Sequence, residues 1–265
     1  MTVGMVESVR IRPAVALAVV AGVALAAAYT DSCLARGDQH PGGLRHAVAG
    51  GDEMDDGRNA AMPPVAHYVA GDGDRFILDK SGPVALLKFD HADEIWALRT
   101  TPGPNGDTIY RNDIGKPILR ATRLGGLTLF TARSPGGEAV ALEGPAPVTH
   151  MPRGTITMLV QAHQYALFHI ARALGHTFNL DAEGQGSEFL FADALNVMTD
   201  TIVKLSELRD GKPYLAAIRE IHMHPAKKMD ARLHNGVLDI SIYPPDGIAG
   251  RPSSVRIAQA IVNPR

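Results

Sequence analysis

Three histidines in the stretch IHMHPAKKMDARLHNG, residues 221–236, have the types and spacing that come closest to a reactive site. His222 and His224 are two positions apart, so their side chains share one face if the segment is a β-strand. His234 stands immediately before Asn235-Gly236, a dipeptide that is typical of a two-residue hairpin turn. Three imidazoles from neighbouring strands could hold Zn²⁺ and leave one coordination position open for a catalytic water.

The same stretch also has an interpretation without a metal. Pro225 and Ala226 follow His224, where a metallohydrolase would supply a carboxylate and a further histidine, and the chain contains no H-E-x-x-H motif. Polar residues are also common beside an Asn-Gly turn. Two hypotheses remain: a zinc-assisted hydrolase that uses His222, His224 and His234, and an exposed hairpin that needs no cofactor. The missing carboxylates favour the hairpin.

Arginines on or beside predicted strands form the second candidate site: Arg99, Arg111, Arg120 and Arg123. Guanidinium groups bind carboxylates and phosphates through two parallel hydrogen bonds, so such a cluster over a sheet predicts a pocket for an anionic ligand. Strand alternation could place Arg99, Arg111 and one of the other two on a single face. Cross-strand pairs with Asp107 and Asp113 would account for the same arginines without a ligand.

Polar side chains also recur at helical spacing on two predicted helices. One set is Tyr165, His169, Arg172 and His176, and the other is Asp193, Asn196, Asp200 and Lys204. An imidazole or carboxyl group would transfer protons only from a cleft that shifts its pKa. The simpler interpretation of both sets is a solvated helix face, with cations favoured near the C-terminal end by the helix dipole.

The elements that would position these residues indicate an α+β fold in a single domain over residues 75–265. Short apolar runs separated by Gly and Pro turns predict an antiparallel β meander or small barrel in the β region, 75–150. Residues 151–212 predict two packed amphipathic helices, and residues 213–265 predict a C-terminal β region with a hairpin at Asn235-Gly236. The segment 251–262 fits a helix capped by Ser253 or Ser254, and equally a strand.

Apolar residues recur at intervals of three and four in both helices, which predicts their core-facing sides. In the first helix these positions are Ile156, Val160, His163, Leu167, Ile170 and Leu174. In the second, from Ser187 to Arg209, they are Phe191, Leu195, Met198, Ile202 and Leu205. Helices of this length should pack together across one sheet face.

The N-terminal 28 residues have the pattern of a secretory signal peptide. Arg10 and Arg12 precede the apolar run PAVALAVVAGVALAAA, which ends in an A-x-A cleavage pattern. The apolar run is shorter than the ~20 residues that a spanning helix needs, which favours a cleaved signal peptide. The alternative is an uncleaved signal that anchors the chain in the inner membrane. We therefore expect a periplasmic or extracellular protein without a stable transmembrane helix after cleavage. Residues 29–74, rich in Gly, Ala, Pro, Asp and Arg, predict a disordered leader.

Composition narrows the classes of partner. The formal net charge is −2 and aromatic residues make up 5% of the chain. Without a cluster of Lys and Arg we expect no nucleic-acid binding, because such binding needs a basic surface. Cys33 is the single cysteine and cannot form an internal disulfide. The composition does not identify a partner, and the expected export favours a protein of the cell envelope.

Two segments, GDTIYRNDIGKPILRATRLGGLTLF and AGRPSSVRIAQAIV, resemble a bacterial family of exported proteins described only as a domain of unknown function. The resemblance extends from Arg75 to the C-terminus and implies export and one family-wide domain, with no reaction, cofactor or catalytic residue. The hypothesis is thus an exported, non-enzymatic binding or interaction module. The alternative is a metal-assisted hydrolase.

Overall fold

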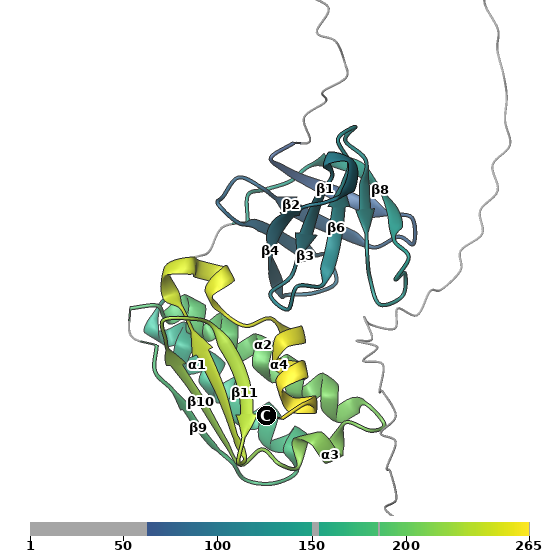
Figure 1. Ribbon diagram of the computed structural model, residues 1–265. Helices are drawn as coiled ribbons and strands as arrows, with labels where there is room; N and C mark the ends of the chain where they lie inside the picture. The colour runs from purple at the N-terminus through teal and green to yellow at the C-terminus, as the bar shows by residue number, and fades with distance from the viewer. Residues whose placement is uncertain (1–62, 150–153, 185, 265) are drawn as a thin grey trace, which may run out of the picture.

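The computed structural model describes residues 63–149, 154–184 and 186–264. These residues form a β-barrel and, below it in Figure 1, a layer of helices packed on a sheet, which we call the α/β layer. Each part has its own cluster of buried apolar side chains, and no residue belongs to both clusters. The chain is therefore built as two bodies, each with a separate core.

Eight antiparallel strands form the barrel in sequence order, and the first closes against the last. The strands are β1 Val65–Ala70, β2 Arg75–Asp79, β3 Ala85–Phe89, β4 Ile95–Pro102, β5 Thr108–Arg111, β6 Pro117–Ala121, β7 Leu127–Leu129 and β8 Glu138–Pro145, with the 3₁₀ turn η1 Pro104–Gly106 before β5. Inward-facing side chains fill the interior: Phe76, Leu78, Leu87, Leu98, Leu119 and Leu129 are all fully buried. Eight strands make a barrel just wide enough for such filling. The predicted small barrel is confirmed.

The barrel begins earlier than the sequence indicated. Strand β1 lies within residues 29–74, which were predicted as a disordered leader, and that prediction is wrong from Val65 onward. The segment VAHYVA contains no Leu, Ile, Met or Phe, but Ala66, Tyr68 and Ala70 point inward and are at most 4% exposed. Strand β1 pairs with both β2 and β8. The rest of the predicted leader and the predicted signal peptide lie outside the described residues.

The α/β layer contains a four-stranded mixed sheet in the order β11-β12-β10-β9. Its elements are α1 Ile156–Leu174, β9 Asn179–Ala182, α2 Glu188–Glu207, α3 Lys212–Leu215, β10 Glu220–Pro225, β11 Asp230–His234, β12 Val237–Ile242, the 3₁₀ segment η2 Pro244–Gly250 and α4 Ser254–Val262. Strands β9 and β10 are parallel and are joined through α2. The helices lie on one face of the sheet, and His222 and His224 on the other face are 42% and 40% exposed.

The predicted C-terminal β region is only partly present. Strands β11 and β12 pair antiparallel across Asn235-Gly236, where both residues have positive φ, as a type I′ turn requires. The same region also contains helices α3 and α4, so the open choice for residues 251–262 is settled as a helix capped by Ser253. Strand β9 between the two long helices was not predicted, because its four residues are too few to show a period.

The core-facing side of α1 differs from the predicted stripe, whereas that of α2 is confirmed. Ile156, Val160 and Leu167 are 71%, 50% and 38% exposed. Ile170 of the predicted stripe is buried as expected, but the other buried residues of α1, which packs against α2, are the smaller Ala162 and Ala166. Small side chains allow two helix backbones to approach closely, so alanines displaced the larger residues from the contact.

Candidate functional site

The N-terminus of α4 is where the barrel and the α/β layer meet. We call this contact the seam, and its hydrogen-bonded residues are Glu94, Asp113, Asp193, Arg251, Ser253, Ser254 and Arg256. The first backbone N–H groups of any helix lack partners within the helix and attract anions. Here the anions are side chains of the barrel.

Two carboxylates from different barrel loops accept hydrogen bonds from this helix end. Glu94, just before β4, accepts from the backbone N of Ser254 at 2.9 Å and contacts its Oγ at 2.5 Å. Asp113, after β5, accepts from the backbone N of Ser253 at 2.9 Å and from its Oγ at 2.6 Å. Each serine is therefore held through both its backbone and its side chain.

Arginines on both sides of the two serines complete the seam. Arg251 is 3% exposed, forms an ion pair with Asp193 of α2, and has its Nη1 3.6 Å from Oε1 of Glu94. Its Nη2 donates to the backbone O of Ile95 at 2.9 Å. Arg256 places its Nε 3.1 Å from Asp113. The seam is thus a continuous network of charges between the two bodies.

Carboxyl groups in and beside the seam have altered acidity. Burial raises the pKa of Glu94 above its ordinary value and the charge of Asp193 adds to this, although Arg251 and the hydrogen bonds from Ser254 act in the opposite direction. Burial likewise raises the pKa of Asp200 on α2, and Asp93 of the barrel contributes. Both groups hold a proton more readily than a solvated carboxyl group does.

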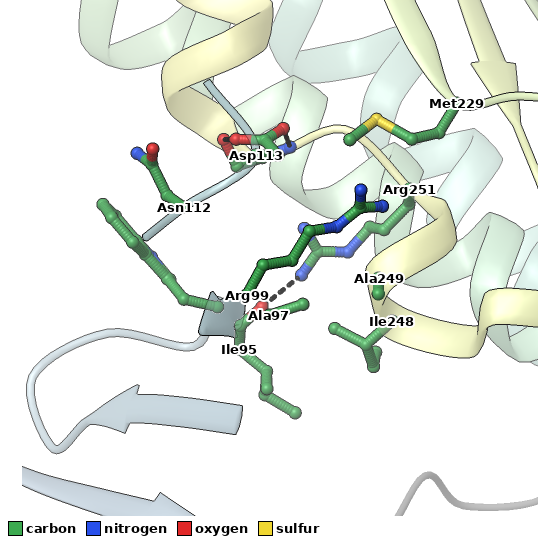
Figure 2. A pocket seen from close by; sticks show the side chains of 11 residues that line it. Ile95, Ala97, Arg99, Asn112, Asp113, Met229, Ile248, Ala249 and Arg251 are labelled. Atoms are coloured by element: carbon green, nitrogen blue, oxygen red, sulfur yellow. Dashed lines mark hydrogen bonds between the residues drawn. The ribbon is translucent and has the colours of Figure 1, made fainter. Parts of the chain in front are cut away.

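A narrow pocket opens at the seam and is lined by both bodies (Figure 2). The barrel contributes Ile95, Trp96, Ala97, Arg99, Asn112 and Asp113, and the α/β layer contributes Met229, Ile248, Ala249, Arg251 and Ser253. The pocket has a volume of about 20 Å³. A space of this size holds one or two water-sized groups, so only the tip of a larger ligand would fit.

The structure divides the four candidate arginines into two pairs. Arg99 and Arg111 are direct neighbours across strands β4 and β5. Arg111 donates to Oγ1 of Thr101 at 3.1 Å and to the backbone O of Gly115 at 2.9 Å. Arg99 is exposed and lines the seam pocket. Of this first pair, Arg99 is the one placed to meet a ligand.

The second pair lies around the β4–β5 turn, away from the pocket. Arg120 forms an ion pair with the buried Asp107, with Nη2 and Oδ2 2.5 Å apart. The side chain of Arg123 packs over Gly106. Arg120 therefore has the protein partner that the cross-strand alternative expected, whereas Asp113 pairs with Arg256 of the α/β layer.

The three candidate histidines lie on one sheet but are not brought together. His222 places Nε2 2.9 Å from Glu220, and His224 places Nε2 2.9 Å from Asp239. His234 lies on β11, which β12 separates from β10, and it is level with Glu220, so about two strand spacings and a further offset along the strands separate it from the other two. Within the described residues, no three His, Cys, Asp or Glu side chains are close enough to hold a metal ion.

The polar stripes of the two helices meet each other. The hydroxyl group of Tyr165 on α1 lies near the carboxyl group of Asp200 on α2, and burial together with this carboxyl group raises the pKa of Tyr165. The Tyr165 and His169 ring centroids lie 4.1 Å apart. Asp193 is bound to Arg251. The prediction of a solvated face is therefore wrong for Asp193 and Asp200, although Asn196 is exposed as expected.

Sequence reasoning missed the seam itself. The segment RPSSVR, residues 251–256, was considered only as a helix cap or a strand, although arginines flank both serines. Two arginines around a Ser-Ser cap are a usable signal for an anion-binding helix end. Their partners, Glu94 and Asp113, are more than a hundred residues away in the sequence, so no local pattern could identify them.

Comparisons with known proteins add a family without an assigned activity. In the described part of the chain, no helix is both long and apolar enough to cross a membrane. No curated protein and no solved structure matches the chain. The model of the family described as Domain of unknown function (DUF4908) matches residues 44–261. That match spans most of the sequence, and the chain therefore belongs to the DUF4908 family.

Proposed function

We propose that the chain is an exported, non-enzymatic binding module whose ligand presents a carboxylate or phosphate group to Arg99. The observation that carries this proposal is the position of Arg99, exposed at a pocket that both bodies line. Among the described residues, no hydrogen bond or ion pair occupies its guanidinium group, whereas Arg111, Arg120 and Arg251 are all bonded to protein atoms. Arg99 therefore keeps its binding capacity for a ligand.

The chemistry of the pocket supports binding. A guanidinium group stays protonated at any physiological pH, so it orients and neutralises an anion and does not transfer protons. The carboxylate of Asp113, which also lines the pocket, is occupied by Ser253 and Arg256. Because the pocket has room only for a few atoms, the rest of the ligand would lie on the outer surface of the barrel, where Arg111 adjoins Arg99.

The N-terminal sequence supports a location outside the cytoplasm. Arg10 and Arg12, followed by the apolar run 13–28 with its A-x-A ending, have the order that a signal peptidase substrate requires. An envelope protein with an acidic surface, or a phosphorylated envelope component, would supply the anionic group.

Fluorescence of the single tryptophan, Trp96, tests the proposal because this residue lines the pocket. Succinate and inorganic phosphate, titrated separately at one fixed pH, distinguish a carboxylate from a phosphate ligand. We expect a saturable change with one of them. Loss of a charge-assisted hydrogen bond costs about 1.5–3 kcal/mol, so Arg99→Gln should weaken binding by about tenfold or more.

Arg123→Gln is the matched control, because it removes the same charge from the barrel surface away from the pocket. It should leave the affinity unchanged, whereas Arg99→Lys should recover only part of the binding, because lysine lacks the two-point geometry. A chain that shows no saturable response to either probe would contradict the proposal. Equal affinities of the Arg99→Gln variant and the unmodified chain would contradict it as well.

A further inference from the structure

Helix α1 carries a row of exposed large apolar side chains on its outward side: Ile156, Val160, Leu167 and Phe168. Of the nine exposed large apolar side chains in the described part of the chain, five lie on this one helix, so the exposure is concentrated there. The outward side of a helix on the surface of a folded protein is ordinarily polar. Helix α1 is therefore apolar on two sides, one packed against α2 and one in contact with solvent.

The outward side of α1 has almost no charge. Its exposed polar residues are the uncharged Thr157, Gln161 and Gln164. Arg172, in the last turn, is the single Lys, Arg, Asp or Glu residue of the whole helix. A charged protein segment would find no complementary charges on this side, and an anionic membrane would find no cluster of Lys and Arg. The chemistry of the surface therefore favours an apolar, uncharged partner.

Two copies of α1 match one another when they run antiparallel. Read from either end, the apolar positions of the outward side have the same spacing of four, seven and four residues: Ile156, Val160, Leu167 and Ala171. A two-fold axis through the middle of this pattern sets Val160 against Leu167 of the second copy. The same axis sets the long Ile156 against the small, half-buried Ala171 of the second copy. A two-fold interface requires such a self-complementary surface.

We propose that the outward side of α1 is a docking surface for a second copy of this chain, with the two α1 helices packed antiparallel across a two-fold axis. An interface of this kind closes after two copies and leaves no further surface of the same type exposed. No residue of α1 lines the pocket at Arg99. The dimer and the proposed anion binding therefore stand or fall separately.

The middle and the length of the contact define its strength. His163 of one copy meets Gln164 of the other, where an imidazole and an amide each offer a donor and an acceptor. The contact is as long as the 19-residue helix, about 28 Å. Two helix faces of this length bury on the order of 1,000 Å², at the lower end for a specific interface. The dimer should therefore dissociate in the micromolar concentration range.

Sedimentation velocity of the full chain, from about 1 to 500 µM, measures this association. We expect the sedimentation coefficient to rise with concentration from the monomer value toward the dimer value. Val160→Lys would bury an unpaired charge against the partner, and should weaken the dimer by about tenfold or more. Leu142→Lys is the matched control, because Leu142 on β8 of the barrel is 55% exposed and Val160 is 50% exposed. Neither change should alter the melting temperature of the monomer, because both side chains are exposed in the single chain.

Disulfide formation distinguishes an antiparallel pair of helices from a parallel pair. The test uses a Cys33→Ser background, because Cys33 is the single native cysteine. Gln164→Cys places a thiol beside the two-fold axis in both copies, so air oxidation should link them into a covalent dimer. The thiols of Thr157→Cys would lie about 20 Å apart along antiparallel helices and should stay reduced. In a parallel pair both variants would form the link.

Four results would overturn the inference. A chain that stays monomeric up to about 500 µM is the first, and a dimer that Val160→Lys leaves intact is the second, because that dimer would use another surface. Cross-linking of Thr157→Cys would contradict the antiparallel arrangement. The last is a monomer that binds phosphatidylglycerol vesicles and loses this binding in Ile156→Ser/Phe168→Ser, which would show that a membrane covers this side of α1 instead.

Discussion

Arg251, in the link between η2 and α4, forms a buried ion pair with Asp193 of helix α2. The side chain of Arg251 is 2% exposed and that of Asp193 is 16% exposed. Arg251 also lies beside Glu94, so one guanidinium group serves two carboxyl groups from different bodies of the molecule. Its removal would leave both of them buried without their cation.

Arg251→Met should therefore be strongly destabilising. Breaking a buried ion pair from one side costs about 3–5 kcal/mol, because the remaining charge keeps its desolvation penalty. The free energy of unfolding, measured with urea, provides the test. Arg232→Met is the control: Arg232 is 64% exposed and pairs with Asp230, and surface pairs of this kind are worth at most about 1 kcal/mol. Equal losses in the two variants would mean that burial of Arg251 contributes nothing.

Tyr68→Phe should stabilise the barrel. The hydroxyl group of Tyr68 is buried in the barrel and has no hydrogen-bond partner among the described residues. An unsatisfied buried polar group costs about 1–3 kcal/mol, so its removal should raise the free energy of unfolding by about 1 kcal/mol. Tyr165→Phe makes the same chemical change where the hydroxyl group is partly exposed and interacts with Asp200, so it should bring no gain in stability. A loss of stability in Tyr68→Phe would be the contrary result.

The two separate cores should respond to truncation independently. Leu119 of the barrel and Leu195 of α2 are both fully buried, and each Leu→Ala change should cost about 2–5 kcal/mol. Amide hydrogen exchange distinguishes the bodies. Leu119→Ala should increase exchange in β1–β8 and spare the sheet β9–β12, and Leu195→Ala should do the reverse. A uniform increase in either variant would instead indicate a single cooperative unit.

The double variant His222→Ala/His224→Ala should have little effect. Both side chains are about two-fifths exposed, and their partners Glu220 and Asp239 are exposed to a similar degree. Exposed pairs of this kind contribute at most about 1 kcal/mol. The melting temperature should be the same with and without added zinc, in the variant and in the unmodified chain. A zinc-dependent rise that the variant lacks would restore the metal hypothesis.

A structural feature of this protein could be predicted from the sequence where its signal is local, and could not where the feature depends on residues far apart in the chain. The α+β class, the barrel and the buried face of α2 were predictable, because alternation and helical spacing are local patterns that report burial directly. The Asn235-Gly236 turn was predictable for the same reason, since positive φ at two adjacent positions favours that pair. The apolar stripe of α1 gave a partly wrong core-facing side. Which of two apolar faces of a helix packs against the core depends on the partner helix.

The tertiary structure alone determined the seam. Ser253 and Ser254 indicate a helix cap in the sequence, but only folding brings Glu94 and Asp113 to that helix end, from a body with a core of its own. Likewise, the sequence could not distinguish the four candidate arginines from one another, because all of them lie on or beside predicted strands. In the folded structure Arg99 lines the pocket between the barrel and the segment η2–α4, whereas Arg120 forms an ion pair with Asp107. Charge partners distant in the sequence are selected by the fold, because Coulomb interactions depend on separation in space.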